Sequence, residues 1–427
     1  MKILWLTETP SKYKPEEYGY NGRGWISSLQ SLLEDSSEIE GLGVVFPHFK
    51  DSKKLKVNKT TYYPIKREMP TNIVTWIISN WKSQIEKTEE INALDAIIKD
   101  YNPDIIHVFG TESWLCHVVS KTNKTCIVHL QGLLQPCYNA YNPVGISNYD
   151  LIKYNWIDFI KGISIWHNKG IFEKKSSREY NFFKDISFFM GRTSWDKNIS
   201  KFLAPHSTYF HVDEVLRDKF YTASAWQYKE GDKIIITSTI SDALYKGLDL
   251  VIKTAKLLKR EKIEFEWRII GVQNNSQTVT LLKRFFQIDY PQLNIKLLGI
   301  KDTEQIISLL SETSLYIHSS YIDNSPNSLC EAQLLGVPVI ATNVGGVSSL
   351  IEDGKTGFLV PANDPYLLAS KIVQLGSDES QLTTISIKAR ETAQKRHSKK
   401  NILNQLIHTY KSLATSQIQV DSKVLIS

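Results

Sequence analysis

The chain has 427 residues, of which 42% are hydrophobic and 22% charged, with a formal net charge of +6. This length exceeds one ordinary core and favours two or three domains, and the composition is globular rather than disordered or fibrous. The mild positive charge suits phosphate-bearing ligands or an anionic membrane surface. No block of Lys and Arg resembles a nucleic-acid-binding arm, so we expect no nucleic-acid partner.

The four cysteines show no CxxC spacing and no histidine at zinc-ligand distance, which is typical of free thiols in a reducing compartment. The apolar run at the N-terminus is too short for a signal peptide. No stretch of eighteen apolar residues occurs. We therefore expect a cytoplasmic protein, in which any membrane contact is peripheral.

Short apolar runs alternate with helix-length segments in the first half of the chain. We predict a helix from Gly24 to Leu33 and further helices within 84–100 and 150–180. The predicted strands are 2–8, 42–47, 104–109, 125–130, 186–190 and 207–211. Runs that are apolar at every position indicate strands buried on both faces, hence a parallel sheet covered by helices.

A second series of strands begins after the polar segment 213–231. Its predicted strands, each followed by a helical stretch, are 232–239, 264–271, 293–299, 314–320 and 337–343. One or two helices follow over 380–414, and a polar, mobile end over 415–427. The fold class is therefore α/β, with two Rossmann-like doubly wound domains over 1–212 and 213–395.

The most informative segment is 319–346. Ser325 and Pro326 predict the N-cap and first residue of a helix that runs to Gly336. Amides of its first turn, together with the helix dipole, would form a pocket for an anion such as a diphosphate. These amides belong to Asn327, Ser328 and Leu329. Asp323, in the preceding loop, and Glu331, more than one turn into the helix, would flank this pocket.

This segment resembles the donor-site signature of family 4 retaining glycosyltransferases of the bacterial polysaccharide-assembly type. The shared pattern is an acidic residue, seven intervening residues, Glu-Ala, a helix, then Gly-x-Pro-Val-Ile-Ala-Thr and Gly-Gly. The resemblance is strong over 230–375 and weaker over 1–212. It implies the GT-B fold, with two Rossmann-like domains facing across a cleft. The acceptor side would be 1–212, the donor-binding side 213–395, and 396–427 would contain a helix that crosses back to the first domain.

The resemblance also implies roles for individual residues. Asp323 would contact the transferred sugar, Glu331 would hold the donor ribose, and Lys246 would neutralise the donor phosphates. Breaking a glycosyl–phosphate bond develops negative charge on the leaving diphosphate, which an ammonium and helix-end amides stabilise. No DxD motif occurs, so we expect neither a metal nor another cofactor.

Three positions depart from the family pattern. Asp323 stands where Glu is usual, no arginine precedes Lys246, and the glutamate after Gly-Gly is replaced near Ser349. The missing arginine leaves the diphosphate to Lys246 and the helix end. Arg192, assigned to the acceptor side of the site, is a candidate substitute.

The first half supplies fewer candidate residues. Gly22 and Gly24 lie at a helix start, where they predict either close approach of backbone to a donor phosphate or sugar, or a flexible turn. His107 and His129 fall at strand ends, and the resemblance favours His129 as the histidine near the reacting sugar and acceptor, against a structural role. Glu112 could orient or deprotonate an acceptor hydroxyl, or cap a helix beginning near Ser113.

The sequence therefore predicts a hexosyltransferase. It would move a hexose-type sugar from a nucleoside diphosphate sugar to a hydroxyl on a growing glycan, with a lipid-linked glycan and peripheral contact with the inner membrane face as further expectations. Three alternatives stay open. They are a sugar-nucleotide epimerase or phosphorylase-like enzyme, a dinucleotide-binding oxidoreductase (opposed by the absence of GxGxxG), and a non-catalytic nucleotide-sugar-binding subunit.

Overall fold

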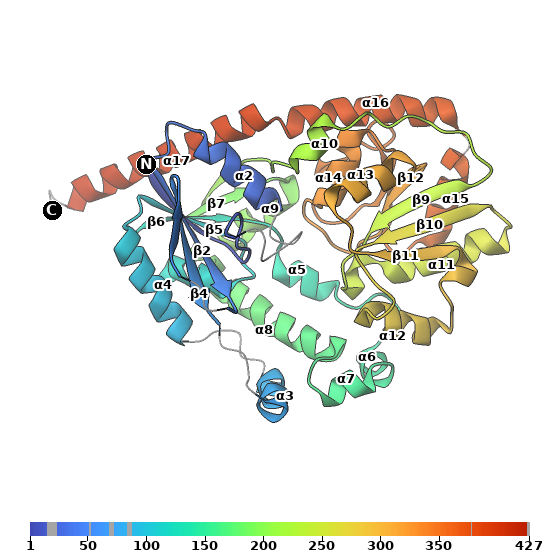
Figure 1. Ribbon diagram of the computed structural model, residues 1–427, viewed down its shortest axis with the longest axis horizontal. Helices are drawn as coiled ribbons and strands as arrows, with labels where there is room; N and C mark the ends of the chain where they lie inside the picture. Colours follow the sequence, from blue (N-terminus) through green and yellow to red (C-terminus); the bar gives the residue numbers. More distant parts are fainter. Residues whose placement is uncertain (15–23, 51–52, 68–71, 83–87, 377, 425–427) are drawn as a thin grey trace. The chain divides into compact units, whose positions relative to one another are not determined.

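The computed structural model describes residues 1–14, 24–50, 53–67, 72–82, 88–376 and 378–424, with 416–424 as backbone only. These residues form two compact units (Figure 1). The first unit comprises Met1–Gln135, Glu173–Val215 and His397–Ser427, and the second comprises Pro136–Phe172 and Leu216–Arg396.

The first unit is built on an eight-stranded sheet, counted over the described residues. Its strand order is β3 (Leu55–Val57), β4 (Thr60–Lys66), β2 (Gly41–His48), β1 (Lys2–Leu6), β5 (Ile105–Phe109), β6 (Thr125–His129), β7 (Phe188–Gly191) and β8 (Thr208–His211). Only the β3–β4 pair is antiparallel. The chain direction across the sheet reverses at β1, which pairs with β2 on one side and β5 on the other.

Helices cover both faces of this sheet. They are α2 (Trp25–Glu34), α4 (Thr88–Tyr101), the 3₁₀ helix η2 (Trp114–Ser120), α9 (Ser194–Leu203) and α17 (Lys399–Val424). Helix α3 (Ile73–Lys82) also belongs to this unit, but none of its described residues is buried. Alternate residues of β1 enter different cores: Ile3 and Trp5 pack with α2 and α17, whereas Leu4 and Leu6 pack on the side of α4.

The second unit has a six-stranded, all-parallel sheet among its described residues. Its order is β11 (Ile295–Gly299), β10 (Phe265–Ile270), β9 (Ile234–Thr239), β12 (Leu315–His318), β13 (Val339–Thr342) and β14 (Phe358–Val360). In chain order this is 3-2-1-4-5-6, the doubly wound order whose switch point lies between β9 and β12. Ligands bind at such a switch point, beyond the carboxyl ends of the strands.

The helices of the second unit follow the predicted strand–helix alternation. They are α6 (Asn148–Lys153), α7 (Trp156–Ile160), α10 (Asp218–Thr222), η3 (Leu244–Lys246), α11 (Leu248–Arg260), α12 (Gln277–Phe286), η4 (Pro291–Leu293), α13 (Thr303–Ser311), α14 (Asn327–Leu335), η5 (Val347–Ser349), α15 (Pro365–Gly376) and α16 (Glu379–Arg396). Two further helices, α5 (Leu134–Asn139) and α8 (Ile165–Phe183), each span the division between the units.

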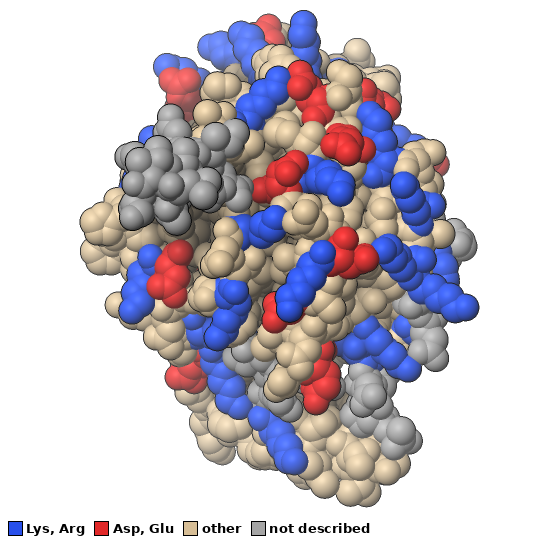
Figure 2. Space-filling model, turned by 90° about the vertical axis from the view of Figure 1, so that its left-hand side faces the viewer, with Lys and Arg blue, Asp and Glu red and all other residues tan. Residues whose placement is uncertain are grey.

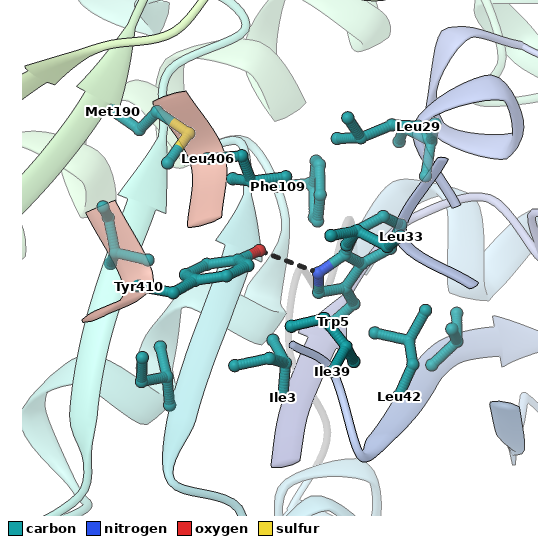
Figure 3. Packing of buried hydrophobic residues seen from close by; sticks show 14 of the residues in the cluster. Ile3, Trp5, Leu29, Leu33, Ile39, Leu42, Phe109, Met190, Leu406 and Tyr410 are labelled. Carbon is teal, nitrogen blue, oxygen red and sulfur yellow. Dashed lines mark hydrogen bonds between the residues drawn. The ribbon is translucent and has the colours of Figure 1, made fainter. Parts of the chain in front are cut away.

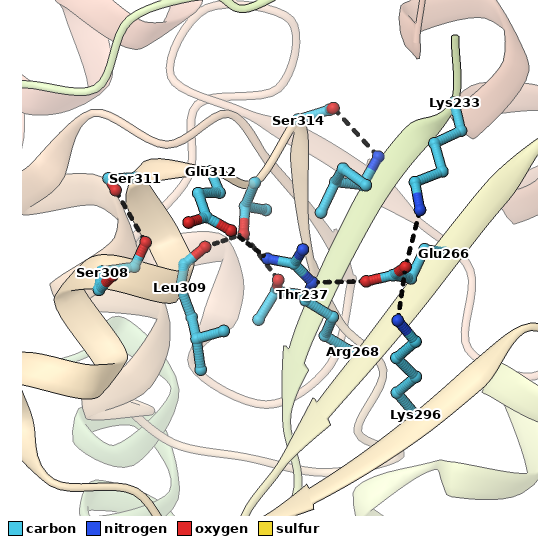
Figure 4. Close-up of polar contacts among 12 residues, drawn as sticks. Lys233, Thr237, Glu266, Arg268, Lys296, Ser308, Leu309, Ser311, Glu312 and Ser314 are labelled. Carbon is cyan, nitrogen blue, oxygen red and sulfur yellow. Dashed lines mark hydrogen bonds and ion pairs between the residues drawn. The ribbon is translucent and has the colours of Figure 1, made fainter. Parts of the chain in front are cut away.

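Charged side chains tie the amino ends of three strands of the second sheet together (Figure 4). Glu266 on β10 accepts hydrogen bonds from Lys233 at 2.8 Å, Arg268 at 2.8 Å and Lys296 at 2.9 Å. Burial alone would raise the pKa of Glu266, but these three cations outweigh it and lower the pKa to about 2. The cluster stabilises the sheet at the edge away from the carboxyl ends.

The predicted α/β class with two doubly wound units is confirmed, and several local expectations differ. β3, β4 and α3 were not expected. The helices expected within 150–180 are α6, α7 and α8, with a break near Gly162, whose φ is +72°. Residues 136–172, placed by the sequence with 1–212, group with the second unit. The backbone of the end expected over 415–427 is helical through Val424, in a stretch without Gly or Pro, and its mobility stays a prediction.

Candidate functional site

Two charged residues meet at the switch point of the second sheet. Lys246 ends η3, the turn that follows β9, and Asp323 lies in the loop that follows β12. Their side chains form an ion pair, with 2.7 Å between Lys246 Nζ and Asp323 Oδ2. The two residues are 77 positions apart in sequence, and they meet because β9 and β12 are neighbours in the sheet.

Two glycines allow the loops to approach this closely. Gly247 has φ +79°, and a Cβ there would lie 1.9 Å from the carbonyl oxygen of Ser319. Gly345 has φ +51°, and a Cβ there would lie 2.0 Å from the carbonyl oxygen of Asp323. Side chains at these positions would push the loops apart, so the glycines fix where Lys246 and Asp323 stand.

Both members of the pair are charged at neutral pH. Burial would raise the pKa of Asp323, but the Lys246 ammonium and His318 hold it well below its ordinary value. Burial would lower the pKa of Lys246, but the Asp323 carboxylate outweighs that effect and raises it. The site therefore holds a charged ammonium, Lys246, next to a charged carboxylate, Asp323, at neutral pH.

The predicted helix is α14, but it begins one residue later than expected, at Asn327 with Pro326 as N-cap. It ends at Gly336, whose φ is +86°. The amide of Leu329 is not available for an anion, because it donates to the Pro326 carbonyl at 3.0 Å. Within the described residues the amides of Asn327 and Ser328 have no hydrogen-bond partner, and Ser325 is buried just before them. Two amides thus face outward from the start of this nine-residue helix.

Glu331 lies apart from the Lys246–Asp323 contact and is held by an arginine that the sequence did not indicate. Arg217 donates to both carboxylate oxygens of Glu331, at 2.6 Å and 2.5 Å, and to Thr303 Oγ1 at 3.2 Å. The guanidinium also lies over the ring of Phe220, 4.8 Å from its centroid. Arg217 is 114 residues from Glu331 and belongs to no motif, so only the fold could reveal it.

In the first unit, His129 ends β6 and is buried beside His107 of β5. Trp25 meets the His129 ring edge to face at 5.3 Å. Arg192 lies over Trp25 and pairs with Glu214 at 3.4 Å, so its guanidinium is committed to partners within this unit. Its role as a substitute phosphate-binding arginine stays a prediction.

The remaining candidates lie near the start of α2 and the end of β5. Gly24 is the N-cap of α2, and a Cβ there would meet open space, while Gly22 lies outside the described residues. Glu112 folds back over Gly110, whose φ is +86° and whose Cβ would lie 2.2 Å from the carboxylate. Burial raises the pKa of Glu112. The cap of η2 is Ser113, which accepts from the Leu115 amide at 3.2 Å, so Glu112 does not have the capping role.

Comparison with known proteins identifies the class. The two units have the GT-B fold, shared with sucrose-phosphate synthase from Thermosynechococcus elongatus at a TM-score of 0.72 and 14% identity, covering 97% of this chain and 100% of that one. HepE of Anabaena, solved in complex with UDP and glucose, aligns at a TM-score of 0.63 and 14% identity, covering 96% of this chain and 100% of that one.

Residues 222–392 match the family model of glycosyl transferases group 1. This part of the chain is thus similar to a group 1 glycosyltransferase domain, and the predicted resemblance to glycosyltransferases is confirmed. The amylovoran biosynthesis glycosyltransferase AmsK of Erwinia amylovora is 27% identical over 176 residues, which is 40% of this chain and 42% of that protein. The chain spans about two fifths of the length of the curated relatives that it matches.

Two features are absent from the part of the chain that the structure describes. No group of three or more His, Cys, Asp or Glu side chains there is arranged to hold a metal ion. None of the helices described is both long and apolar enough to cross a bilayer.

Proposed function

We propose that this chain is a retaining hexosyltransferase of the family 4 type. It moves a hexose-type sugar from a nucleoside diphosphate sugar to a hydroxyl on a growing glycan, lipid-linked acceptors included, without a metal. The observation that carries the proposal is the Lys246–Asp323 pair at the switch point of a group 1 glycosyltransferase domain. AmsK, the relative named above, is an amylovoran biosynthesis glycosyltransferase, and HepE was solved with UDP and glucose.

We propose that the site residues have separate roles during transfer. The Lys246 ammonium and the outward amides of Asn327 and Ser328 stabilise the charge that develops on the departing diphosphate. Asp323 accepts hydrogen bonds from the transferred sugar. Glu331, fixed by Arg217, accepts from the ribose hydroxyls.

Donor turnover tests this assignment. Purified protein is incubated with a panel of nucleoside diphosphate sugars and glycan acceptors, with and without EDTA, and released nucleoside diphosphate is measured. Lys246→Ala should lower kcat/KM about tenfold or more, at least about 1.4 kcal/mol of transition-state stabilisation. The control is Lys259→Ala, an exposed lysine on the neighbouring helix α11, which should transfer like the parent. Equal rates for the two variants would remove Lys246 from the site, and loss of activity in EDTA would refute metal independence.

We also propose that helix α3 of the first unit makes a peripheral membrane contact. None of its described residues is buried, and the exposed fractions of its apolar side chains are 72% for Ile73, 61% for Val74, 48% for Ile78 and 46% for Trp81. The helix has no acidic residue in its first turn and ends in Lys82. A helix whose apolar face is exposed and whose end is basic suits the interface of an anionic bilayer. Figure 2 shows Lys and Arg side chains spread over one face of the molecule, with Asp and Glu side chains among them.

Vesicle co-sedimentation tests the membrane contact. The double variant Ile78→Ser/Trp81→Ser should bind anionic vesicles at least about fivefold more weakly than the parent. It lacks two apolar side chains that the bilayer would bury in the parent. Phe202→Ser is the control, since Phe202 on α9 is 80% exposed and lies outside α3. Equal binding by both variants would exclude α3 as the contact.

A further inference from the structure

Four aromatic side chains of the first unit form a continuous row of hydrogen bonds. Trp5 Nε1 lies 3.1 Å from the Tyr410 hydroxyl, which lies 2.6 Å from His107 Nδ1. His107 Nε2 then lies 3.3 Å from Nδ1 of His129. Figure 3 shows Tyr410 of α17 and Trp5 of β1 joined in the middle of the apolar cluster.

The tyrosine is not needed for packing alone. Helix α17 packs against the rest of the first unit through Ile402, Leu406, Tyr410 and Leu413, which recur every three or four residues and are all buried. An apolar side chain would complete this stripe, and Tyr410 adds one hydroxyl to it. Because that hydroxyl is excluded from water, its free energy depends on the partners found inside the protein.

The row has a direction because its first member can only donate. An indole N–H has no acceptor, so Trp5 donates to the Tyr410 oxygen. The Tyr410 hydroxyl then donates its hydrogen bond to His107 Nδ1, the other hydrogen-bonding atom beside it. A neutral imidazole carries a single proton, so His107 has its proton on Nε2 and donates to Nδ1 of His129. The proton of His129 is therefore on Nε2.

Either direction leaves His129 Nε2 without a partner among the described residues, but the opposite direction leaves a second group unsatisfied. If His107 Nδ1–H donated to Tyr410, the tyrosine would accept twice and its own proton would have no acceptor among the described residues. A buried hydroxyl proton without an acceptor is unfavourable. Burial lowers the pKa of His107 to about 3 and that of His129 well below its ordinary value, so both rings are neutral at physiological pH and each has one proton to place.

We propose that Tyr410 is a positioning residue that fixes His129 as the Nε2–H tautomer. His129 then offers a hydrogen-bond donor, and not a proton acceptor, to an oxygen of the bound acceptor. His129 Nε2 is buried and has no hydrogen-bond partner within the described part of the chain, and His129 ends β6 at the carboxyl edge of the sheet. The role of the donated hydrogen bond rests on the proposed function, whereas the tautomer follows from the row itself.

The tautomer can be measured without any substrate. Full-length protein labelled with 15N-histidine is studied by NMR, and the His129 signals are assigned by their loss in His129→Gln. We expect the proton of His129 on Nε2 throughout the neutral pH range. A proton on Nδ1, or a mixture of the two forms, would overturn the proposal.

A pair of tyrosine variants tests the role of Tyr410. Tyr410→Phe removes the hydroxyl and keeps the ring, and we expect His107 and His129 to become mixtures of tautomers. Its kcat/KM should fall about tenfold. Tyr101→Phe is the matched control, because the Tyr101 hydroxyl is buried in the same unit and has no partner among the described residues. The control should keep the single tautomer and the parental rate.

The outcomes separate the two proposals. An unchanged tautomer in Tyr410→Phe, or equal rates for the two variants, would overturn the positioning role. If Tyr410→Phe does not fold, the wild-type NMR signals decide the direction of the row. An Nε2–H tautomer in a protein that turns over no nucleotide sugar would support the row and refute the proposed function.

Discussion

Removing Arg217 should test both the stability of the second unit and its donor site. Arg217→Met deletes the guanidinium that binds both oxygens of Glu331 and leaves that carboxylate buried without its main partner. Breaking a buried ion pair by deleting one member costs about 3–5 kcal/mol. The Arg217 side chain is 13% exposed and that of Glu331 is 6% exposed. Some solvent screening remains, so we expect a loss at the lower end, about 3 kcal/mol.

Urea denaturation and ligand titration measure the two effects. The comparison is Lys219→Met, which removes the exposed Lys219–Glu304 pair and should cost about 0–1 kcal/mol. In the double variant Arg217→Met/Glu331→Gln no charge is left unpaired, so the loss should be smaller than the sum of the single losses. Affinity for the nucleoside diphosphate that best stabilises the parent should fall about tenfold in Arg217→Met, because Glu331 loses its orientation. An Arg217→Met protein as stable as Lys219→Met, with parental affinity, would refute this reasoning.

Two further predictions concern the second unit. The lowered pKa of Glu266 contributes stability that is fully present above its ordinary value of 4.5 and is lost as the pH falls towards 2. Two of its three partners are half exposed, so we expect about 1–2 kcal/mol, and urea denaturation between pH 5 and pH 2 should show a shallower loss in Glu266→Gln. Gly247→Ala would place a Cβ 1.9 Å from the Ser319 carbonyl oxygen and displace Lys246, so kcat/KM should fall at least about tenfold while Gly354→Ala, with open space at its Cβ, changes it less.

The sheets could be predicted from the sequence where their strands are apolar throughout. In β12 and β13, the runs Leu-Tyr-Ile and Val-Ile-Ala are buried at every position, so composition and position agree. Strand β4 was missed because it contains Pro64 and because its buried residues include Thr60 and Tyr62. Gln30 of α2 satisfies the polar atoms of both, with bonds of 3.4 Å and 2.6 Å. A strand stabilised by such long-range bonds has no local signature.

In the candidate site, too, some residues could be predicted from the sequence and others could not. Asp323 and Glu331 belong to one continuous segment, so the amino-acid sequence alone shows their spacing. Lys246 was found through a motif, and the sheet order explains why it meets Asp323. Arg217 and Tyr410 could not be found by either route, because each acts on a partner more than a hundred residues away and neither lies in a recognisable pattern.

The aspartate at position 323, where the family usually has glutamate, is explained by how tightly its backbone is held. The Asp323 carbonyl accepts from the Gly346 amide at 3.0 Å, and Gly345 packs against it with no room for a Cβ. From this fixed backbone the short Asp323 side chain accepts hydrogen bonds from the Lys246 ammonium at 2.7 Å and from the Asn324 amide at 3.1 Å. A glutamate on the same backbone would carry its carboxylate one methylene further from the backbone that makes these contacts possible. The aspartate thus fits the loop in which it lies, because the loop places Asp323 close enough to Lys246 for the shorter side chain to form the ion pair.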